Sequence, residues 1–582
     1  MRIYTKDFNL DPRGLEDSTF GFIDLINHIK EVSKNNEYID LYVDKGDYVL
    51  SKENGQERHL YLSNTDSLDY PVKAIGLFLD HINNLTIHGN GSKLIIYGDM
   101  MAMAIVNCKN VIIRDLTVTY KSPTSTEMKL IDYQGNSYKG LFKITNAFDY
   151  IINHNDLIWL SDRDSHGRYY WMEKNAHKNY GIYVRYPQYG MTKIYDSQYS
   201  PFENVKNIRE IKRGLVEISY QVKPKIKLSK GMIFQFTSNV YRKTAGAFIE
   251  HSSNIRCENI NFNYLPGFGF LVQMCENVSF RGCNFIGNKE RELNVSSAAD
   301  GIHVSGAKGM VEILDCRFDN CLDDPINIHG TYTVVEEIID NHTLILSYKH
   351  RQQGGFTQYY KGDKLVFYDA NSLKEKFSGR EYIVKDYSIP YGDNFQQMKV
   401  TLQDNIPDQL RKLRLKGSIV CENRSYNPEV HIRGNSFTNT ATRCLLVTSG
   451  KEILIEDNIF DKPSMAALYV SSDAKTWFES SNVKKIIIRN NIFINNSLDD
   501  NSGAYLPCIY FDPQVDLDSN YYVHENIVIE NNKFILEKGG ALKASHVNHL
   551  RFRENNVIKK ENNYSDTLNF YKCSNIDTDY NN

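Results

Sequence analysis

The stretch EILIEDNIF, residues 452–460, belongs to a series of nine-residue phrases with one shared pattern. Apolar and polar residues alternate, and each phrase ends in Phe or, at both ends of the series, in Val. This alternation is typical of a β-strand with one buried face. The phrases are NVIIRDLTV (110–118), NIRCENINF (254–262), NVSFRGCNF (277–285), MVEILDCRF (310–318), EVHIRGNSF (429–437), EILIEDNIF, KIIIRNNIF (485–493), NIVIENNKF (526–534) and HLRFRENNV (549–557).

The spacing of the phrases predicts a solenoid. Their ends lie 23 residues apart at three places (262 to 285, 437 to 460 and 534 to 557), and two intervals of 33 and one of 41 allow a longer turn. A repeat in the low twenties with β-branched residues and polar turns is typical of stacked β coils. Helical leucine-rich repeats would need Leu at fixed offsets, and these are absent. We therefore expect an all-β fold, a right-handed parallel β-helix.

The position two residues before the end of each phrase predicts a corner of the coil. Cys283 and Cys316 hold this position in two adjacent phrases, where we expect them to pack as small apolar groups. In five other phrases an Asn stands there, and stacked Asn side chains can form a ladder of hydrogen bonds. These residues are Asn435, Asn458, Asn491, Asn532 and Asn555.

Two gaps, 118–262 and 318–437, interrupt the repeat and are too long for loops without structure. Both contain short alternating strands between Gly, Asp and Lys turns, so we expect a small antiparallel β-barrel in each. The segment DSTFGFIDLINHIKEVSK, 17–34, predicts an amphipathic helix that caps the open end of the solenoid. The expected organisation is a cap and first coils (1–120), an inserted barrel (121–245), central coils with the site (246–332), a second barrel (333–428) and C-terminal coils (429–582).

Composition excludes several classes of function. The 582 residues carry a formal net charge of −3, which gives no electrostatic basis for binding nucleic acid. Ten Cys without a CxxC pair indicate neither a zinc site nor a disulfide scaffold. No long apolar run predicts membrane insertion, and the N-terminus lacks a signal-peptide core. The expected location is cytoplasmic, or periplasmic or secreted if an export signal was removed. The oligomeric state stays open.

Two neighbouring stretches share a frame that carries acidic residues. In DGIHVSG (300–306) and DPINIHG (324–330), Asp300 aligns with Asp324. On adjacent coils their carboxyl groups would lie about 4.8 Å apart, the spacing of paired strands. Such a pair repels, and one member tends to hold a proton unless a cation or a shared water intervenes. Asp323 must point in another direction, so three carboxyl groups are expected to converge at one corner.

The same alignment predicts which side chains face outward. Ile249, Val272, Val304 and Ile328 are expected to point inward, so their neighbours form two outward columns. One column holds Phe248, Leu271, His303 and Asn327, and the other holds Glu250, Gln273, Ser305 and His329. The polar column suits a sugar-binding surface, although an ordinary solvated face has the same pattern. The candidates for hydrogen bonds to sugar hydroxyls are His303, Asn327, His329, Glu250 and Gln273.

Three carboxyl groups are sufficient for hydrolysis of a glycosidic bond. In an inverting reaction one acid protonates the leaving oxygen while a carboxylate activates water on the opposite face of the sugar. We expect Asp300 and Asp324 to hold and deprotonate that water. Asp323 is the expected general acid, with its pKa raised by two anionic neighbours.

At DGIHVSGAKG and LDDPINIHGTY the sequence resembles glycoside hydrolase family 110, the exo-acting α-1,3-galactosidases. The resemblance spans most of the chain. It implies removal of terminal α-1,3-linked galactose with inversion, no metal or other cofactor, and Asp300, Asp323 and Asp324 as catalytic residues. The implied partner is a galactose-terminated glycan, either branched like the blood-group-B antigen or linear.

Three alternatives remain open at this stage. A polygalacturonase-like β-helix hydrolase also uses paired aspartates, although its RIK-type segment is absent here. A pectate-lyase-like enzyme would bind Ca²⁺ through Asp300, Asp323 and Asp324. A non-catalytic glycan-binding solenoid would keep the polar columns without needing each carboxyl group.

Overall fold

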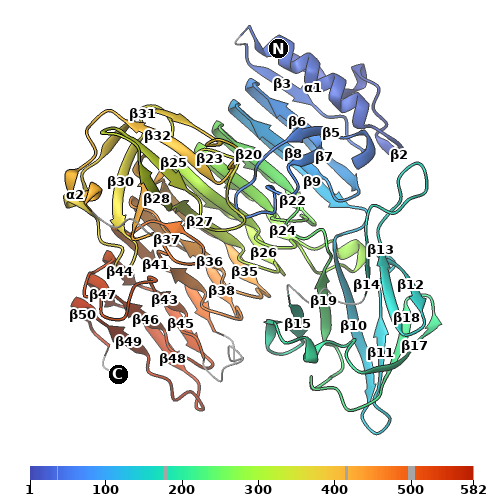
Figure 1. The fold of residues 1–582 in the computed structure, drawn as a ribbon. Coiled ribbons are helices and arrows are strands. Elements are labelled where there is room, and N and C mark those ends of the chain that lie inside the picture. Colours follow the sequence, from blue (N-terminus) through green and yellow to red (C-terminus); the bar gives the residue numbers. More distant parts are fainter. Residues whose placement is uncertain (36, 175–180, 413–416, 496–504, 581–582) are drawn as a thin grey trace.

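The computed structural model describes residues 1–582 except 36, 175–180, 413–416, 496–504 and 581–582. Its main body is a parallel β-helix, which confirms the predicted fold (Figure 1). Each coil adds one strand to each of three columns, because each phrase of the repeat pairs in parallel with the next. In the C-terminal coils, for example, Ile455 pairs with Ile432 on one side and Ile488 on the other.

Three columns of parallel strands make up the solenoid. The first column contains β1 (Arg2–Tyr4), β3 (Ile39–Tyr42), β7 (Asn83–Tyr97), β9 (Lys109–Tyr120), β21 (Ser253–Glu258), β23 (Phe270–Arg281), β25 (Ile302–Leu314), β34 (Glu429–Arg433), β37 (Glu452–Glu456), β41 (Lys485–Arg489), β44 (His524–Glu530), β47 (Val547–Arg553) and β50 (Ser574–Thr578). The second contains β2 (Arg13–Asp17), β4 (Asp47–Ser51), the ends of β7 and β9, β22 (Asn261–Phe262), β24 (Asn284–Ile286), β26 (Arg317–Asp319), β35 (Ser436–Thr438), β38 (Ile459–Asp461), β42 (Ile492–Ile494), β45 (Lys533–Leu536) and β48 (Asn556–Lys559). The third contains β6 (Val72–Asp80), β8 (Met101–Val106), β20 (Ala247–Glu250), the starts of β23 and β25, β27 (Ile326–Thr331), β36 (Leu445–Val447), β39 (Leu468–Val470), β43 (Ile509–Phe511), β46 (Leu542–Ser545) and β49 (Leu568–Tyr571).

The phenylalanines that end the phrases form a continuous stack inside the solenoid. The rings of Phe437 and Phe460 lie 5.0 Å apart with an angle of 3° between their planes. One buried ring per coil fixes the register, since a slip of one residue would turn the ring to the solvent. The stack runs through Phe262, Phe285, Phe318, Phe437, Phe460, Phe493 and Phe534.

The predicted asparagine ladder is confirmed. The amide nitrogen of Asn435 donates to Oδ1 of Asn458 at 2.9 Å, and Asn458 donates to Asn491 at 3.0 Å. The series continues from Asn491 to Asn532 and from Asn532 to Asn555. All ten cysteines are free thiols, and Cys283 and Cys316 are buried, which agrees with the packing role expected of them.

Replacing one asparagine of the ladder is expected to destabilise the solenoid. Oδ1 of Asn491 accepts from the backbone and side-chain nitrogens of Asn458, which Asn491→Ala would leave without this acceptor. We expect the free energy of unfolding to fall by about 2–4 kcal/mol, measured by chemical denaturation. Asn556→Ala, at an exposed strand position, is the matched control and should change it by less than about 0.5 kcal/mol. Equal effects of the two variants would contradict the role of the ladder.

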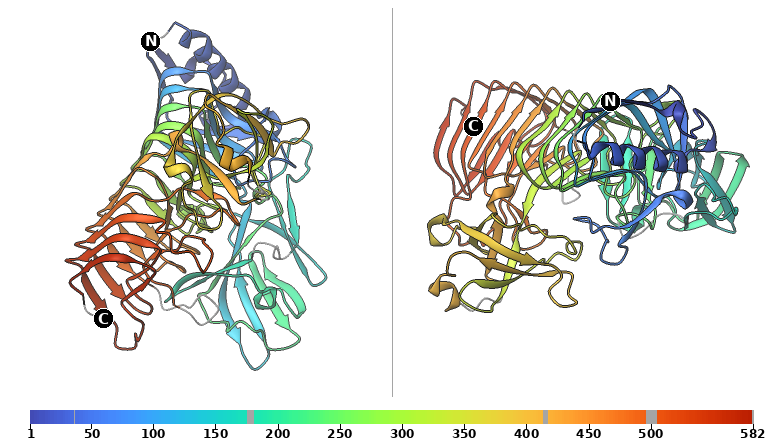
Figure 2. Two further views of the ribbon diagram at one scale, coloured as in Figure 1. Left: turned by 60° about the vertical axis from the view of Figure 1, so that its left-hand side comes forward. Right: turned by 90° about the horizontal axis from the view of Figure 1, so that it is seen from above.

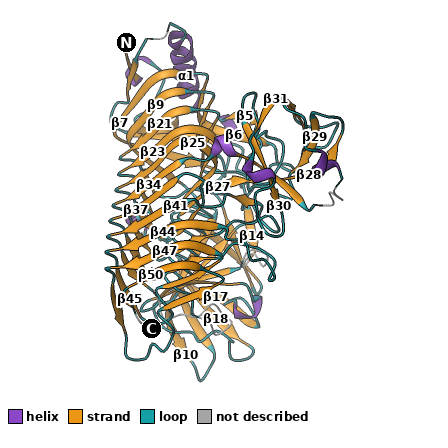
Figure 3. Cartoon of the chain, turned by 90° about the vertical axis from the view of Figure 1, so that its left-hand side faces the viewer, coloured by secondary structure: helices purple, strands orange, loops and turns teal. Residues whose placement is uncertain are grey.

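A helix caps the N-terminal end of the solenoid, as predicted. Helix α1 (Thr19–Ser33) buries Phe22, Leu25, Ile26 and Ile29 in the main core. Figure 3 shows it at the end of the stacked strands. No helix among the described residues is long and apolar enough to cross a membrane.

Two antiparallel β units are inserted between coils, and Figure 2 shows them projecting from the solenoid. The second is a closed barrel of β28 (Thr333–Ile338), β29 (Thr343–Ser347), β32 (Gln397–Leu402), β31 (Tyr382–Ser388), β30 (Lys364–Asp369) and β33 (Ile419–Asn423). The first has a seven-stranded sheet in the order β16 (Gly190–Ile194), β15 (Ile182–Tyr186), β19 (Ile233–Thr237), β10 (Ser125–Gln134), β11 (Lys139–Lys143), β18 (Leu215–Tyr220) and β17 (Val205–Lys212). A separate sheet of β12 (Asp149–Asn153), β13 (Asp156–Leu160) and β14 (Met172–Lys174) accompanies it.

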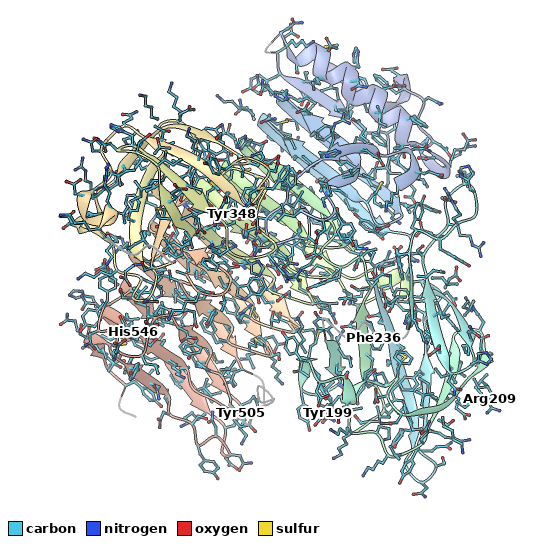
Figure 4. The ribbon with its side chains drawn as sticks, viewed as in Figure 1. Tyr199, Arg209, Phe236, Tyr348, Tyr505 and His546 are labelled. Atoms are coloured by element: carbon cyan, nitrogen blue, oxygen red, sulfur yellow. The ribbon has the colours of Figure 1, made fainter. Side chains whose placement is uncertain are left out.

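The first insert differs from the predicted small antiparallel β-barrel, since the two edge strands of its seven-stranded sheet do not pair among the described residues. Its edge strand β16 lies against the solenoid, where Thr192 accepts a hydrogen bond from Ser464 at 3.3 Å, instead of pairing with β17. Each insert has its own apolar core: Phe236 is buried in the first and Tyr348 in the second (Figure 4).

Candidate active site

The strand register aligns the two aspartates as their shared frame predicts. Strand β25 pairs with β27 through Ile302 and Ile326, and Ser297 pairs with Cys321 a few residues earlier. Both pairings place Asp300 and Asp324 at equivalent positions of adjacent coils. On the next coil Ile326 pairs with Leu445, so Arg443 follows Asp324 in the same column.

The predicted inward column is confirmed. Ile249, Val272, Val304 and Ile328 pair in sequence across four coils, and all four are fully buried in the core. Their neighbours therefore point out of the solenoid, and the site is built on this outer surface of the third column.

Asp300, Asp323 and Asp324 all line one pocket of about 600 Å³. The coils form its floor, and both inserts contribute to its walls: Lys193 and Tyr195 come from the first, Arg351 and Gln352 from the second. Other lining residues are Asn64, Tyr241, Arg242, Phe268, Asn327, Thr442, Arg443, Leu446, Met465, Tyr469, Ser471, Asp473, Thr476, Trp477, Glu479, Asp512 and Gln514. The two insertions thus turn an open sheet face into a walled pocket.

Asp324 is held by four donated hydrogen bonds. Arg443 binds it through two side-chain nitrogens, Nε to Oδ1 at 3.0 Å and Nη2 to Oδ2 at 2.7 Å. The backbone nitrogen of Arg443 and the hydroxyl of Thr442 also donate to Oδ1, at 3.2 and 2.7 Å. Burial raises the pKa of Asp324, and the Arg443 guanidinium opposes this shift. Because every partner donates, the contacts favour the ionised carboxylate.

Asp323 faces a different cation. Nη2 of Arg242 lies 3.3 Å from its Oδ2, and Arg242 also donates to the backbone oxygen of Asn64 at 3.1 Å. The guanidinium of Arg242 lies 4.6 Å from the ring centre of Phe268. Arg242 has a φ of +61°, a strained conformation for a residue with a side chain that is typical of functional sites. Burial lowers the pKa of the half-buried Lys193, but the negative charge of Asp323 outweighs this effect, and the pKa is raised.

Among the described residues, no lysine or arginine lies within ion-pairing distance of Asp300, and its side-chain partner is His303. Its Oδ2 lies 2.8 Å from Nδ1 of His303, whose side chain is fully buried. Burial, and then the charges of Asp323 and Asp324, raise the pKa of Asp300 well above its usual range. The sequence did not predict this raised pKa of Asp300, whose side chain is only 5% exposed.

Of the five residues expected to bind sugar hydroxyls, Asn327 lines the pocket. Its Oδ1 is buried without a hydrogen-bond partner, so it is free to accept from a hydroxyl group. His303 and His329 lie behind Asp300, with their Nε2 atoms 2.9 Å apart. Glu250 and Gln273 lie outside the pocket lining and contact each other at 2.8 Å.

The expected open polar strip is covered in the structure. Gln273 accepts a hydrogen bond from the backbone of Ser63 and donates to the backbone of Tyr61, so the 61–63 segment lies over the column. Ser63 also contacts Ser305 at 2.7 Å. Burial raises the pKa of Glu250 to about 7. The alternation correctly shows which side chains point outward, but not that another segment of the chain covers them.

Several lining residues were not predicted. Arg443 could have been found, because the inward frame continues to Val447, which places Arg443 at the position of Asp300 and Asp324. Arg242, Trp477 and Glu479 lie in irregular segments or in the short strand β40 (Glu479–Ser480), where no repeat predicts their positions. Glu479 and Asn327 lie 3.5 Å apart, and Trp477 lies 5.7 Å from the guanidinium of Arg242.

The described residues also bring Glu53, Asp164 and His166 together as one group that could hold a metal ion. None of these three lines the pocket. Glu53 accepts hydrogen bonds from the backbone and side chain of Ser165, which accounts for its position.

Three carboxyl groups in one walled pocket on a parallel β-helix are compatible with glycoside hydrolysis, which needs two of them. No protein-family model matches the sequence. The chain is 32% identical to alpha-1,3-galactosidase A of Bacteroides thetaiotaomicron over 91% of its own length and 88% of that protein. It is 26% identical to alpha-1,3-galactosidase B of the same organism over 96% of this chain and 86% of the relative. The chain belongs to the α-1,3-galactosidase family, glycoside hydrolase family 110, and is therefore a glycosidase.

Among solved structures, the mannuronan C-5 epimerase AlgE6 A-module of Azotobacter vinelandii matches all of both chains with a TM-score of 0.39 and 9% identity. A similarity this distant supports no functional argument.

Proposed function

We propose that the protein is an exo-acting, inverting α-1,3-galactosidase that works without a metal ion and removes terminal galactose from glycans with branched blood-group-B-like or linear α-galactosyl ends. The observation that carries the proposal is the convergence of Asp300, Asp323 and Asp324 in one walled pocket of a chain from this family. Walls from both inserts favour an enzyme that binds one chain end. A sugar inside a long polymer would need an open groove.

The contacts of each aspartate support a division of roles. Asp324 is held as a carboxylate by Arg443, which suits a base that activates water. Asp323 is the most exposed of the three side chains, at 15% against 5% for Asp300 and 3% for Asp324. In an exo-acting enzyme the leaving glycan extends toward the solvent, so the most exposed carboxyl group is best placed to protonate the leaving oxygen. Asp300, which aligns with Asp324 on the adjacent coil, would hold and deprotonate the same water molecule.

The charges of the pocket support a mechanism without metal. Arg443 and Arg242 already lie 2.7 and 3.3 Å from the carboxyl oxygens of Asp324 and Asp323, so a cation such as Ca²⁺ would have to displace a guanidinium to bind both carboxyl groups. The resemblance to glycoside hydrolase family 110 also implies a mechanism without a metal ion. The arginines instead fix the two carboxyl groups in position, which is a prerequisite for acid–base catalysis.

The protein is expected to release free galactose from galactose-α-1,3-galactose at the same rate with and without EDTA. Proton NMR of the first turnovers should show β-galactose before mutarotation, since a water attacking opposite the leaving group inverts the anomeric centre. α-1,4- and α-1,6-linked digalactosides serve as controls and should release little or none. Release of α-galactose first would contradict inversion, and loss of activity in EDTA would contradict the metal-free mechanism. Binding of the disaccharide without release would indicate a glycan-binding solenoid.

A further inference from the structure

A chain of three buried side chains leads away from the pocket behind Asp300. Oδ2 of Asp300 lies 2.8 Å from Nδ1 of His303, and Nε2 of His303 lies 2.9 Å from Nε2 of His329. Nδ1 of His329 in turn lies 2.6 Å from the backbone oxygen of Gly330. Both imidazole side chains are fully buried. Asp300 lines the pocket but neither histidine does, so the two imidazole rings do not contact substrate directly.

The last contact sets the direction of all the others. A carbonyl oxygen only accepts, so Nδ1 of His329 carries a hydrogen. Nε2 of a neutral His329 then accepts, and Nε2 of His303 must donate to it. Nδ1 of a neutral His303 has no hydrogen left to donate, and it must accept one from Asp300. With both imidazoles neutral, the geometry therefore requires Asp300 to be a carboxylic acid.

The chain also permits a second arrangement with the same atoms. If Asp300 passes its proton to Nδ1 of His303, the hydrogen on Nε2 of His303 moves to Nε2 of His329. The products are a carboxylate at Asp300, a neutral His303 with its hydrogen on Nδ1, and an imidazolium at His329. Oε1 of Glu479 lies 3.4 Å from Nε2 of His329, where its negative charge would stabilise that imidazolium.

We propose that Asp300, His303 and His329 share one proton along this chain, which rests on Asp300 and moves to His329 when Asp300 acts on the water. His303 and His329 are then positioning residues that control the charge of Asp300. The inference rests on the proposed function only for the use of the Asp300 carboxylate as a base. Which atoms of Asp300, His303 and His329 carry hydrogens in the resting enzyme does not depend on that function.

The surroundings favour the proton on Asp300 in the empty pocket. Asp323, Asp324 and Glu479 surround the carboxyl group of Asp300 with negative charge, and Arg242 opposes them. Burial, together with His329 and Arg242, lowers the pKa of His303 well below its usual range, so His303 stays neutral. Edge contact with the ring of Phe268, 4.6 Å away, completes the apolar surroundings of His303.

This shared proton resolves a conflict between the role of Asp300 and its surroundings. A general base must be ionised, yet a buried carboxyl group beside the carboxylate of Asp324 holds its proton. Transfer to His329 frees Asp300 to accept the proton of the attacking water. That proton then passes to Asp323, which lines the same pocket and has given its own proton to the leaving oxygen, and reverse transfer from His329 restores the resting state. The proton taken from water thus replaces the one that Asp323 gave away, and the three side chains keep one shared proton.

Selective ¹⁵N labelling of histidine tests the resting state without substrate. In the resting enzyme the NMR spectrum should show His303 with its hydrogen on Nε2 and His329 with its hydrogen on Nδ1. His303→Asn and His329→Asn assign the signals. Asp300→Asn should leave both tautomers unchanged, because the amide nitrogen donates to Nδ1 of His303 as a protonated carboxyl group does. A hydrogen on Nδ1 of His303 in the resting wild type would overturn the proposal.

The pH dependence of kcat/KM tests the transfer. In His329→Asn the proton of Asp300 has no acceptor at the end of the chain, so kcat should fall at least 50-fold with KM within about threefold. The acidic limb of the kcat/KM profile should move to higher pH by at least one unit, because Asp300 then keeps its proton to higher pH. His524→Asn is the matched control, since it removes a buried imidazole outside the pocket lining.

The control variant should keep the wild-type pH profile even if it is less stable. A fall in the activity of His329→Asn with an unmoved acidic limb would show a merely structural role and overturn the transfer. If the wild type hydrolyses no α-galactoside, the proposed function fails, while the NMR result still decides the proton order of the chain.

Discussion

Asp323→Ala is expected to lower kcat/KM on galactose-α-1,3-galactose by about 10³–10⁴-fold while leaving an activated aryl α-galactoside within about tenfold of the wild-type rate. A sugar leaving group needs a proton from the acid, whereas p-nitrophenolate departs without one. Steady-state rates on the two substrates, compared at one pH, measure the difference. This is the largest change predicted here, because it removes the residue proposed to break the glycosidic bond.

Asp324→Ala provides the comparison that assigns the roles. Loss of the base should slow both substrates by about the same factor, since neither can be attacked without an activated water. Azide needs no base, so adding it should restore turnover of the aryl substrate by Asp324→Ala and yield β-galactosyl azide. If azide instead rescues Asp323→Ala while Asp324→Ala loses activity only on the disaccharide, the two roles are reversed.

The second large effect is expected from Arg443→Met. Removing the guanidinium leaves the carboxylate of Asp324 buried without its cation, and the free energy of unfolding should fall by about 3–5 kcal/mol at neutral pH. Arg443 opposes the rise in the pKa of Asp324, so without it that pKa rises further. The base is then protonated up to a higher pH, and the acidic limb of kcat/KM should move to higher pH by at least about one unit.

Two variants control for loss of the arginine itself. Arg489→Met removes an exposed arginine that binds Glu456 at 2.7 Å, and it should change the free energy of unfolding by less than about 1 kcal/mol. The double variant Arg443→Met with Asp324→Asn removes the buried charge as well, so it should regain stability relative to Arg443→Met while remaining inactive. If Arg443→Met alone is as stable as the wild type, the proposed burial of a charged carboxylate at Asp324 is contradicted.

The two histidines illustrate where sequence reasoning reaches its limit in the site. The alternation of β25 and β27 correctly turned His303 and His329 outward, and outward polar residues were expected to meet sugar. The structure buries both rings behind Asp300, where Phe268 packs against His303 and Glu479 lies 3.4 Å from His329. Local periodicity defines the direction of a side chain but not what covers it: Ser63, which contacts Ser305 in the same outward column as His329, lies 242 residues earlier in the chain.

The sequence by itself determined the stacked coil, its inward Phe and Ile columns, its asparagine ladder and the alignment of Asp300 with Asp324. These features follow from repeats between neighbouring coils, where hydrogen-bonded strands force equivalent residues into contact. Only the tertiary structure decided what surrounds the three acids: Arg443 beside one, Arg242 beside another and a neutral histidine beside the third. Arg443 lies one coil away in the frame of Asp324 and His303 only three residues from Asp300, but Arg242 comes from an irregular segment, and burial among these partners, which no local pattern encodes, sets the charge of each carboxyl group.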